Sequence, residues 1–205
     1  MDISTPGLIL GLVENACLVI IIFYLLSRIK FFNSVLDGKL NGKTQIILAV
    51  IFGILAIYGT YSGIKTSGAI ANIRNLAPMI AGLIGGPWVG LGAGIIGGVH
   101  RYFMGGFTAI PCALGTIISG VAAGILYRSF KGNAGIWKST LFAFIMEIVD
   151  MALILLIARP FDEALRLVNI IALPMILSDT IGIAIFAFMF SNITRHFKIT
   201  QLPPG

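Results

Sequence analysis

Residues 72–116 read NIRNLAPMIAGLIGGPWVGLGAGIIGGVHRYFMGGFTAIPCALGT, and two features of this stretch decide the fold. The first is a glycine at every fourth position, namely Gly82, Gly86, Gly90, Gly94 and Gly98. Small residues at this spacing share one helix face and allow a second helix to approach closely inside a membrane. The second is a pair of arginines, Arg74 and Arg101, on either side of the glycines. Arginines beside apolar spans are costly and usually have a specific partner.

The composition around this stretch is that of a membrane protein. Hydrophobic residues make up 58% of the chain and charged residues 11%, whereas a soluble domain carries about 25% charged residues. The ten-residue alternation of an outer-membrane barrel is absent, so we predict an all-α polytopic membrane protein. The net charge of +6 does not indicate nucleic-acid binding, because most lysines and arginines lie in the connections between spans.

The hydrophobic pattern predicts about seven helices. A single helix over 73–99 would be ~40 Å long, and Gly85-Gly86-Pro87 in its middle favours a turn. A single crossing would also put the later basic connections outside, against the positive-inside rule. We therefore expect a short hairpin, with the N-terminus outside and the C-terminus inside. The predicted helices are 7–27, 46–62, 73–84, 87–99, 107–127, 139–158 and 168–191.

We expect residues 1–205 to form a single transmembrane domain in the cytoplasmic membrane of a bacterium or archaeon. The first span, 7–27, follows no basic region and contains no signal-peptidase-like site, so it is expected to be retained. The core is expected over 46–191. The segment ARPFDEALRLV, at 158–168, is interpreted as an amphipathic turn at the outer interface. A cytoplasmic output domain is not expected within these residues.

On this topology both ends of the hairpin reach the outer face, and the 107–127 helix starts there. Two guanidinium groups, a thiol and a hydroxyl then converge in the outer third of the membrane, from Arg74, Arg101, Cys112 and Thr116. The helix starts near Asn72 and Phe107 can add backbone N–H donors. Two guanidinium groups can hold a small carboxylate from two sides. The sequence thus predicts an anion-binding site, with neither catalytic residues nor a metal or other cofactor, because no catalytic motif or Cys/His cluster is present.

The acidic residues inside the spans leave alternatives open. One alternative is that Glu14, Glu147, Asp150 or Asp179 pairs with an arginine, which would make the arginines structural. Glu147 and Asp150 are three residues apart and share a helix face. The other alternative is that these two acids relay protons for transport.

The combination of N-x-R, the GGP turn, GG-x-HR-Y-x-MGG and the following cysteine resembles the membrane sensor region of LytS-type (LytS/YhcK) sensor histidine kinases. Similar regions head some diguanylate cyclases, and substrate-capture subunits of vitamin transporters are distantly similar. In the pyruvate-sensing members, two arginines, a cysteine and a serine bind the ligand. The first three correspond to Arg74, Arg101 and Cys112, whereas the serine position is Gly115, next to Thr116.

The resemblance implies a receptor that binds a small, pyruvate-like carboxylate at the outer face. It also implies a homodimer that signals through a cytoplasmic kinase and response-regulator pathway, with enzymatic activity only in an output domain beyond residue 205. The alternative is a transporter or solute-capture component for a small organic molecule. The expected partners are therefore the carboxylate, the lipid bilayer, a second copy of the chain and the kinase pathway, and nucleic acid is not among them.

Overall fold

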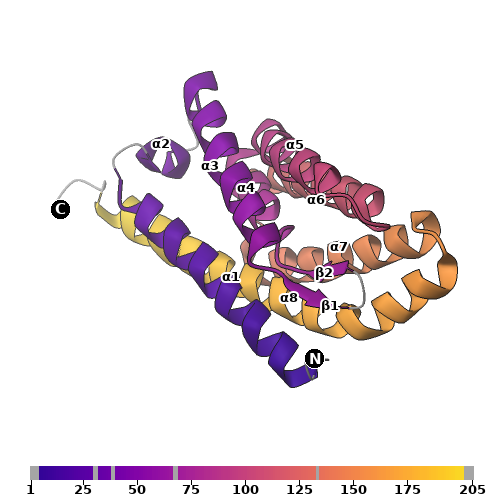
Figure 1. The fold of residues 1–205 in the computed structure, drawn as a ribbon. Helices are drawn as coiled ribbons and strands as arrows, with labels where there is room; N and C mark the ends of the chain where they lie inside the picture. The colour runs from indigo at the N-terminus through magenta and orange to yellow at the C-terminus, as the bar shows by residue number, and fades with distance from the viewer. Residues whose placement is uncertain (1–4, 30–31, 38–39, 67–68, 133, 201–205) are drawn as a thin grey trace.

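The computed structural model describes residues 5–29, 32–37, 40–66, 69–132 and 134–200, which form eight helices and one small β-hairpin (Figure 1). The elements are α1 (Thr5–Ser27), α2 (Asn33–Leu36), α3 (Gly42–Tyr61), β1 (Ile64–Thr66), β2 (Ala69–Ala71), α4 (Leu76–Gly85), α5 (Pro87–Phe103), α6 (Ala109–Ser129), α7 (Gly135–Ile157) and α8 (Phe161–Thr200).

Five of the described helices are long and apolar enough to cross a membrane, which confirms the prediction of a multi-pass, all-α membrane protein. They cover Pro6–Ser27, Gly42–Tyr61, Ala109–Ser129, Gly135–Ile157 and Phe161–Phe197. A span of about 20 apolar residues matches a hydrocarbon core of ~30 Å. The remaining long apolar stretch is divided into the shorter helices α4 and α5.

The predicted hairpin at Gly85–Pro87 is confirmed. Gly86 connects α4 to α5 with φ of 82°, a left-handed conformation that favours glycine. Pro87 then occupies the first turn of α5, where its fixed φ suits a helix start and its missing N–H is not needed.

The repeated glycines pack the hairpin against a third helix rather than only pairing its two arms. A Cβ added at Gly90 would clash with the backbone carbonyl of Gly120 in α6, and a Cβ at Gly120 would clash with Gly90. A Cβ at Gly94 would lie 2.9 Å from Cα of Ile117, and one at Gly98 would lie 2.8 Å from the Ala113 carbonyl oxygen. The glycine face of α5 therefore brings the backbone of α6 into direct contact.

Helices α1 and α8 lie side by side and run in the same direction (Figure 1). Ala16 lies opposite Gly182, and further along both helices Phe23 packs on Phe186 and Phe190 with ring centroids 4.8 and 6.3 Å apart. If successive helices alternate in direction across the membrane, the first and the last helix are parallel only when the total number of helices that alternate is odd. The predicted set of helices, with the hairpin counted as two, satisfies that requirement.

Three expectations were wrong in detail. The segment 28–45, expected as a connection, contains the short helix α2, in which Val35 is buried, and Phe32 directly before the helix is buried as well. The connection after α3 forms an antiparallel hairpin that pairs Ile64 with Ala71. The predicted interfacial turn at 158–168 instead supplies the first turns of α8, which runs without interruption for 40 residues rather than over 168–191 alone.

The start of α8 at Phe161, earlier than the predicted residue 168, has a physical explanation in the first turn of the helix. Asp162 and Glu163 lie there, where carboxylates interact favourably with the helix dipole. Ala164 and Leu167 of the same segment are buried in the core. The charges that resembled an interfacial turn thus lie on the exposed face of a packed helix.

The contact between α5 and α6 can be tested with Gly90→Ala. Because the added Cβ meets a backbone carbonyl, the helices must separate, and we expect a loss of about 1–3 kcal/mol of stability. Thermal unfolding of the purified protein in detergent, followed by circular dichroism, measures the change. Gly42→Ala is the matched control, since a Cβ there meets nothing within 4 Å and alanine favours a helix. Equal melting temperatures for Gly90→Ala and the wild type would contradict the packing argument.

Candidate functional site

Arg74 is fully buried in the segment between β2 and α4. Its Nε donates a hydrogen bond to the Thr116 hydroxyl, and its Nη2 donates to the backbone carbonyl of Cys112 over 3.1 Å. Both acceptors belong to the same face of α6. The guanidinium group is therefore fixed to the helix that the glycines hold against the hairpin.

Arg101 is 3% exposed and lies in the last turn of α5. Its Nη1 donates to the carbonyl oxygen of Gly105 over 2.7 Å, and its Nη2 donates to the Thr108 hydroxyl over 2.9 Å. Thr108 precedes the first residue of α6. The connection between α5 and α6 thus folds back over the second guanidinium group.

The structure brings both arginines to Cys112, as the sequence predicted. The Cys112 side chain is close enough to each guanidinium group to interact with it electrostatically. Cys112 and Cys17 are both free thiols. Thr116, one helical turn after Cys112, is also buried and accepts the hydrogen bond from Arg74. Four of the predicted ligand residues, Arg74, Arg101, Cys112 and Thr116, thus form one buried cluster.

Asn72 and Gly115, the two other predicted ligand residues, contact neighbouring parts of the protein. The Asn72 side chain accepts from the backbone N–H of Arg74 over 3.1 Å and donates to the Ile70 carbonyl over 2.8 Å, so it shapes the turn that carries Arg74. Gly115 faces α7, because a Cβ there would clash with the carboxylate of Asp150. The absent side chain at position 115 makes room for that carboxylate.

Two residues of this cluster were missed by the sequence reasoning. Asn75 donates through Nδ2 to Glu147 Oε1 over 3.1 Å, and its Oδ1 lies 3.0 Å from the Thr116 hydroxyl. Thr108 contacts Arg101 as described. Both lie within a few residues of a predicted site residue, and both are polar residues beside a helix start. Their position in the chain, close to these residues, was the only feature of the sequence that indicated a place in the site.

Several buried polar atoms in this region have no hydrogen-bond partner. They are Nη1 of Arg74, Nε of Arg101, Oε2 of Glu147 and both carboxylate oxygens of Asp150 and of Asp179. Within the described part of the chain, neither guanidinium group forms an ion pair with a carboxylate; their partners are the neutral oxygens named above. Buried native polar groups are rarely left unpaired. The alternative of a structural ion pair is thus not observed among the described residues, and each arginine keeps one nitrogen atom with unused N–H donors.

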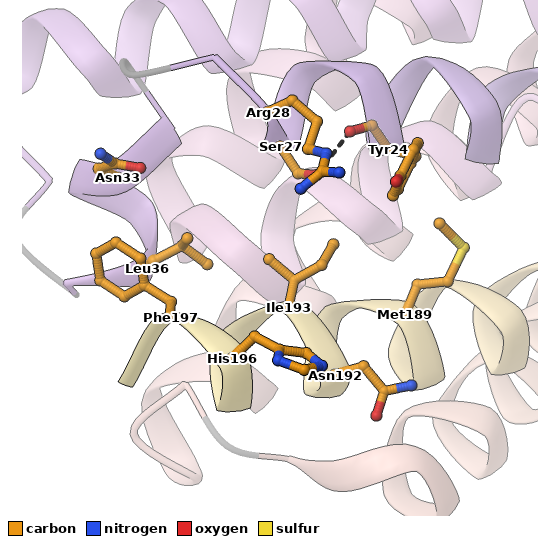
Figure 2. Close-up of a pocket in the computed structure, with 10 residues that line it drawn as sticks. All are labelled: Tyr24, Ser27, Arg28, Asn33, Leu36, Met189, Asn192, Ile193, His196 and Phe197. Atoms are coloured by element: carbon orange, nitrogen blue, oxygen red, sulfur yellow. Dashed lines mark hydrogen bonds between the residues drawn. The ribbon is translucent and has the colours of Figure 1, made fainter. Parts of the chain in front are cut away.

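Outside the arginine cluster, the described chain meets the requirements of a metal site or of a ligand pocket less well. No group of three or more His, Cys, Asp or Glu side chains is arranged to hold a metal ion among the described residues. A hollow of about 700 Å³ lies between the C-terminal ends of α1 and α8, beside α2, where Figure 2 shows Arg28 and His196 on opposite sides. It contains none of the predicted ligand residues.

Comparison with known proteins matches this chain to one protein family and to several bacterial sensor proteins. The family described as 5TMR of 5TMR-LYT matches residues 29–193. Sensor histidine kinase BtsS of Escherichia coli (strain K12) is 34% identical over 209 residues, which cover 96% of this chain and 37% of BtsS. Sensor protein LytS of Bacillus subtilis (strain 168) is 35% identical over 207 residues, which cover 92% of this chain and 35% of LytS. The chain thus spans little more than a third of these relatives. No solved structure matches it significantly.

The role of Thr116 can be tested with Thr116→Val, which keeps the shape of the side chain but removes the acceptor of Arg74 Nε. A buried donor that loses its partner costs about 1–3 kcal/mol, so we expect a lower melting temperature. The control is Thr140→Val on α7, whose hydroxyl bonds only to the Ile136 carbonyl at an exposed position. Similar melting temperatures for the two variants would show that Thr116 does not hold Arg74.

Proposed function

Because this chain belongs to the 5TMR-LYT family, the five-transmembrane sensor regions of LytS-type sensor histidine kinases, we propose that it is a receptor for a small carboxylate such as pyruvate. The carboxylate binds between Arg74 and Arg101, beside Cys112. Binding is passed to a cytoplasmic kinase module in a homodimer. The observation that supports this most strongly is the pair of buried guanidinium groups that form no ion pair among the described residues and that each have one nitrogen atom without a hydrogen-bond partner.

The chemistry of these groups suits a monocarboxylate of a few carbon atoms. A carboxylate has two oxygens, and each can accept a charge-assisted hydrogen bond from a guanidinium N–H. The free atoms, Arg74 Nη1 and Arg101 Nε, belong to different arginines. A ligand that satisfies both therefore lies between the two side chains. The Cys112 thiol, which is near both, offers a weak donor for a keto oxygen.

Resemblance to pyruvate-sensing members supports pyruvate as the first ligand to test. Arg74, Arg101 and Cys112 occupy the corresponding positions, whereas Gly115 replaces the serine. The lost hydroxyl is a reason to compare pyruvate with other short carboxylates. The family assignment also favours a sensor over the alternative of a transporter.

We expect the N-terminus outside and the C-terminus inside the cell, so that the arginines face the outer side. The basic connections after α1 and α6 and the basic end of α8 support this orientation through the positive-inside rule.

Ligand binding is tested by isothermal titration calorimetry of pyruvate with the purified protein in nanodiscs. Lysine cannot reproduce the planar fork of arginine, so Arg74→Lys and Arg101→Lys should each weaken binding at least about tenfold. Arg166→Lys on the exposed face of α8 is the matched control and should bind normally. Pyruvamide, which lacks the carboxylate, should not bind. Affinity that is unchanged in both site variants would refute the proposed site.

Orientation is tested with single cysteines in a background where Cys17 and Cys112 are replaced by serine. Met104→Cys lies in the connection after α5, and Ser129→Cys lies at the end of α6. Both native side chains are exposed. A membrane-impermeant maleimide should label Met104→Cys in intact cells, and Ser129→Cys only after permeabilisation. The opposite pattern would reverse the proposed topology.

A further inference from the structure

Three buried carboxylic acids lie directly behind the arginine cluster. Glu147 and Asp150 come from α7 and Asp179 from α8, and each is at most 1% exposed. Five of their six oxygens have no hydrogen-bond partner, and the sixth, Oε1 of Glu147, accepts from Asn75. A membrane domain that contains so many unpaired carboxylate oxygens needs a physical reason.

The three acids form one group with the arginines. Asp150 packs against Gly115, which lies between Cys112 and Thr116 on α6. Glu147 is joined to Thr116 and hence to Arg74 through the two ends of the Asn75 amide. Glu147 and Asp179 interact with each other, and Asp150 interacts with Arg74 and Arg101.

The charged and titratable groups around these acids can be named element by element. Arg74 precedes α4, His100 and Arg101 come from α5, and Cys112 comes from α6. The acids themselves are the groups from α7 and α8. Neutral Asn75 and Thr116 lie between the acids and Arg74.

The charge balance of this group matters because all of it is buried. Two guanidinium groups face three carboxyl groups, so full ionisation leaves one excess negative charge. A bound carboxylate would add a second. Uncompensated charge in a low-dielectric interior costs several kcal/mol, and protonation of a carboxylate removes it. The unpaired oxygens of Asp150 and Asp179 are acceptors to which a proton can add.

We propose that Glu147, Asp150 and Asp179 form a proton-binding cluster, so that a carboxylate at Arg74 and Arg101 binds together with one proton. The inference rests on the proposed carboxylate site. The proton comes from the solvent and adds to a carboxylate oxygen of the cluster, and no other bond changes. The linkage has a defined sign: proton uptake on binding makes the ligand bind more tightly at low pH and more weakly as the pH rises.

The test is calorimetric titration of pyruvate into the wild-type protein at one pH, near neutrality, in PIPES and in imidazole. These buffers differ in ionisation enthalpy, so the difference in observed binding enthalpy gives the number of protons taken up. We expect about one proton per ligand, and an affinity that falls by up to roughly tenfold per pH unit between about pH 6 and pH 8. Equal enthalpies in both buffers with a pH-independent affinity would overturn the coupling and leave the carboxylate site standing. Absence of binding at any pH would refute the site itself.

Single variants assign the proton to the cluster. Asp150→Asn, Glu147→Gln and Asp179→Asn each remove one titrating group with little change of shape. We expect the largest loss of proton uptake in Asp150→Asn, because Asp150 lies against the helix turn that carries Cys112 and Thr116. Asp162→Asn, at an exposed position in the first turn of α8, is the control and should keep the full uptake. Unchanged uptake in all three cluster variants would place the proton elsewhere and overturn the proposal, and a variant that does not fold leaves the wild-type measurement decisive.

Discussion

The structure depends on the need to supply hydrogen-bond acceptors to two buried guanidinium groups. Each carries five N–H donors and no acceptor, and neither is paired with a carboxylate among the described residues. The acceptors for Arg74 come from α6, including the backbone carbonyl of Cys112. A helix carbonyl is within reach only if the two segments lie very close together. Gly82 of α4 provides that approach, because a Cβ there would lie 2.5 Å from the Gly120 carbonyl oxygen of α6, so helix packing and arginine burial are a single constraint.

The features that could be predicted from the sequence follow from strong local rules. Bilayer thickness limits span length, and the loop charges determine how many times the chain crosses. Gly86 and Pro87 then fix where the hairpin turns. These rules are sufficient to bring Arg74, Arg101 and Cys112 to the same end of neighbouring helices. They do not specify which atoms of those residues form hydrogen bonds.

The features that could not be predicted depend on tertiary contacts. The segment 158–168 has balanced charges that fit either an interfacial turn or the exposed face of a helix, and only the burial of Ala164 and Leu167 decides for α8. Asn72 and Asn75 lie on either side of Arg74, and both are polar. The direction of each side chain makes the first a support for the turn and the second a link to Glu147.

The hydrogen bonds of Asn75 connect the arginine cluster to the last helix, α8. From Arg74 the contacts pass through Thr116 and Asn75 to Glu147 on α7, and then to Asp179 on α8. Helix α8 is continuous for 40 residues, which corresponds to about 60 Å, roughly twice the hydrocarbon core. Asp179 lies near its middle, so under the proposed function a displacement there would be carried along the helix beyond the membrane.

A ligand shifts such an equilibrium only if it binds one arrangement more tightly than the other. Under the proposed coupling the difference has a physical source, because the ligand would change the charge that the buried acids must balance. An anion at the arginines would favour the arrangement in which the acids hold a proton and donate hydrogen bonds to one another. Glu147 on α7 and Asp179 on α8 interact directly, so a proton shared by these acids changes the electrostatic interaction across the contact between the two helices. Under the proposed coupling, the charge of the buried acids at the contact between α7 and α8 therefore differs between the free and the ligand-bound protein.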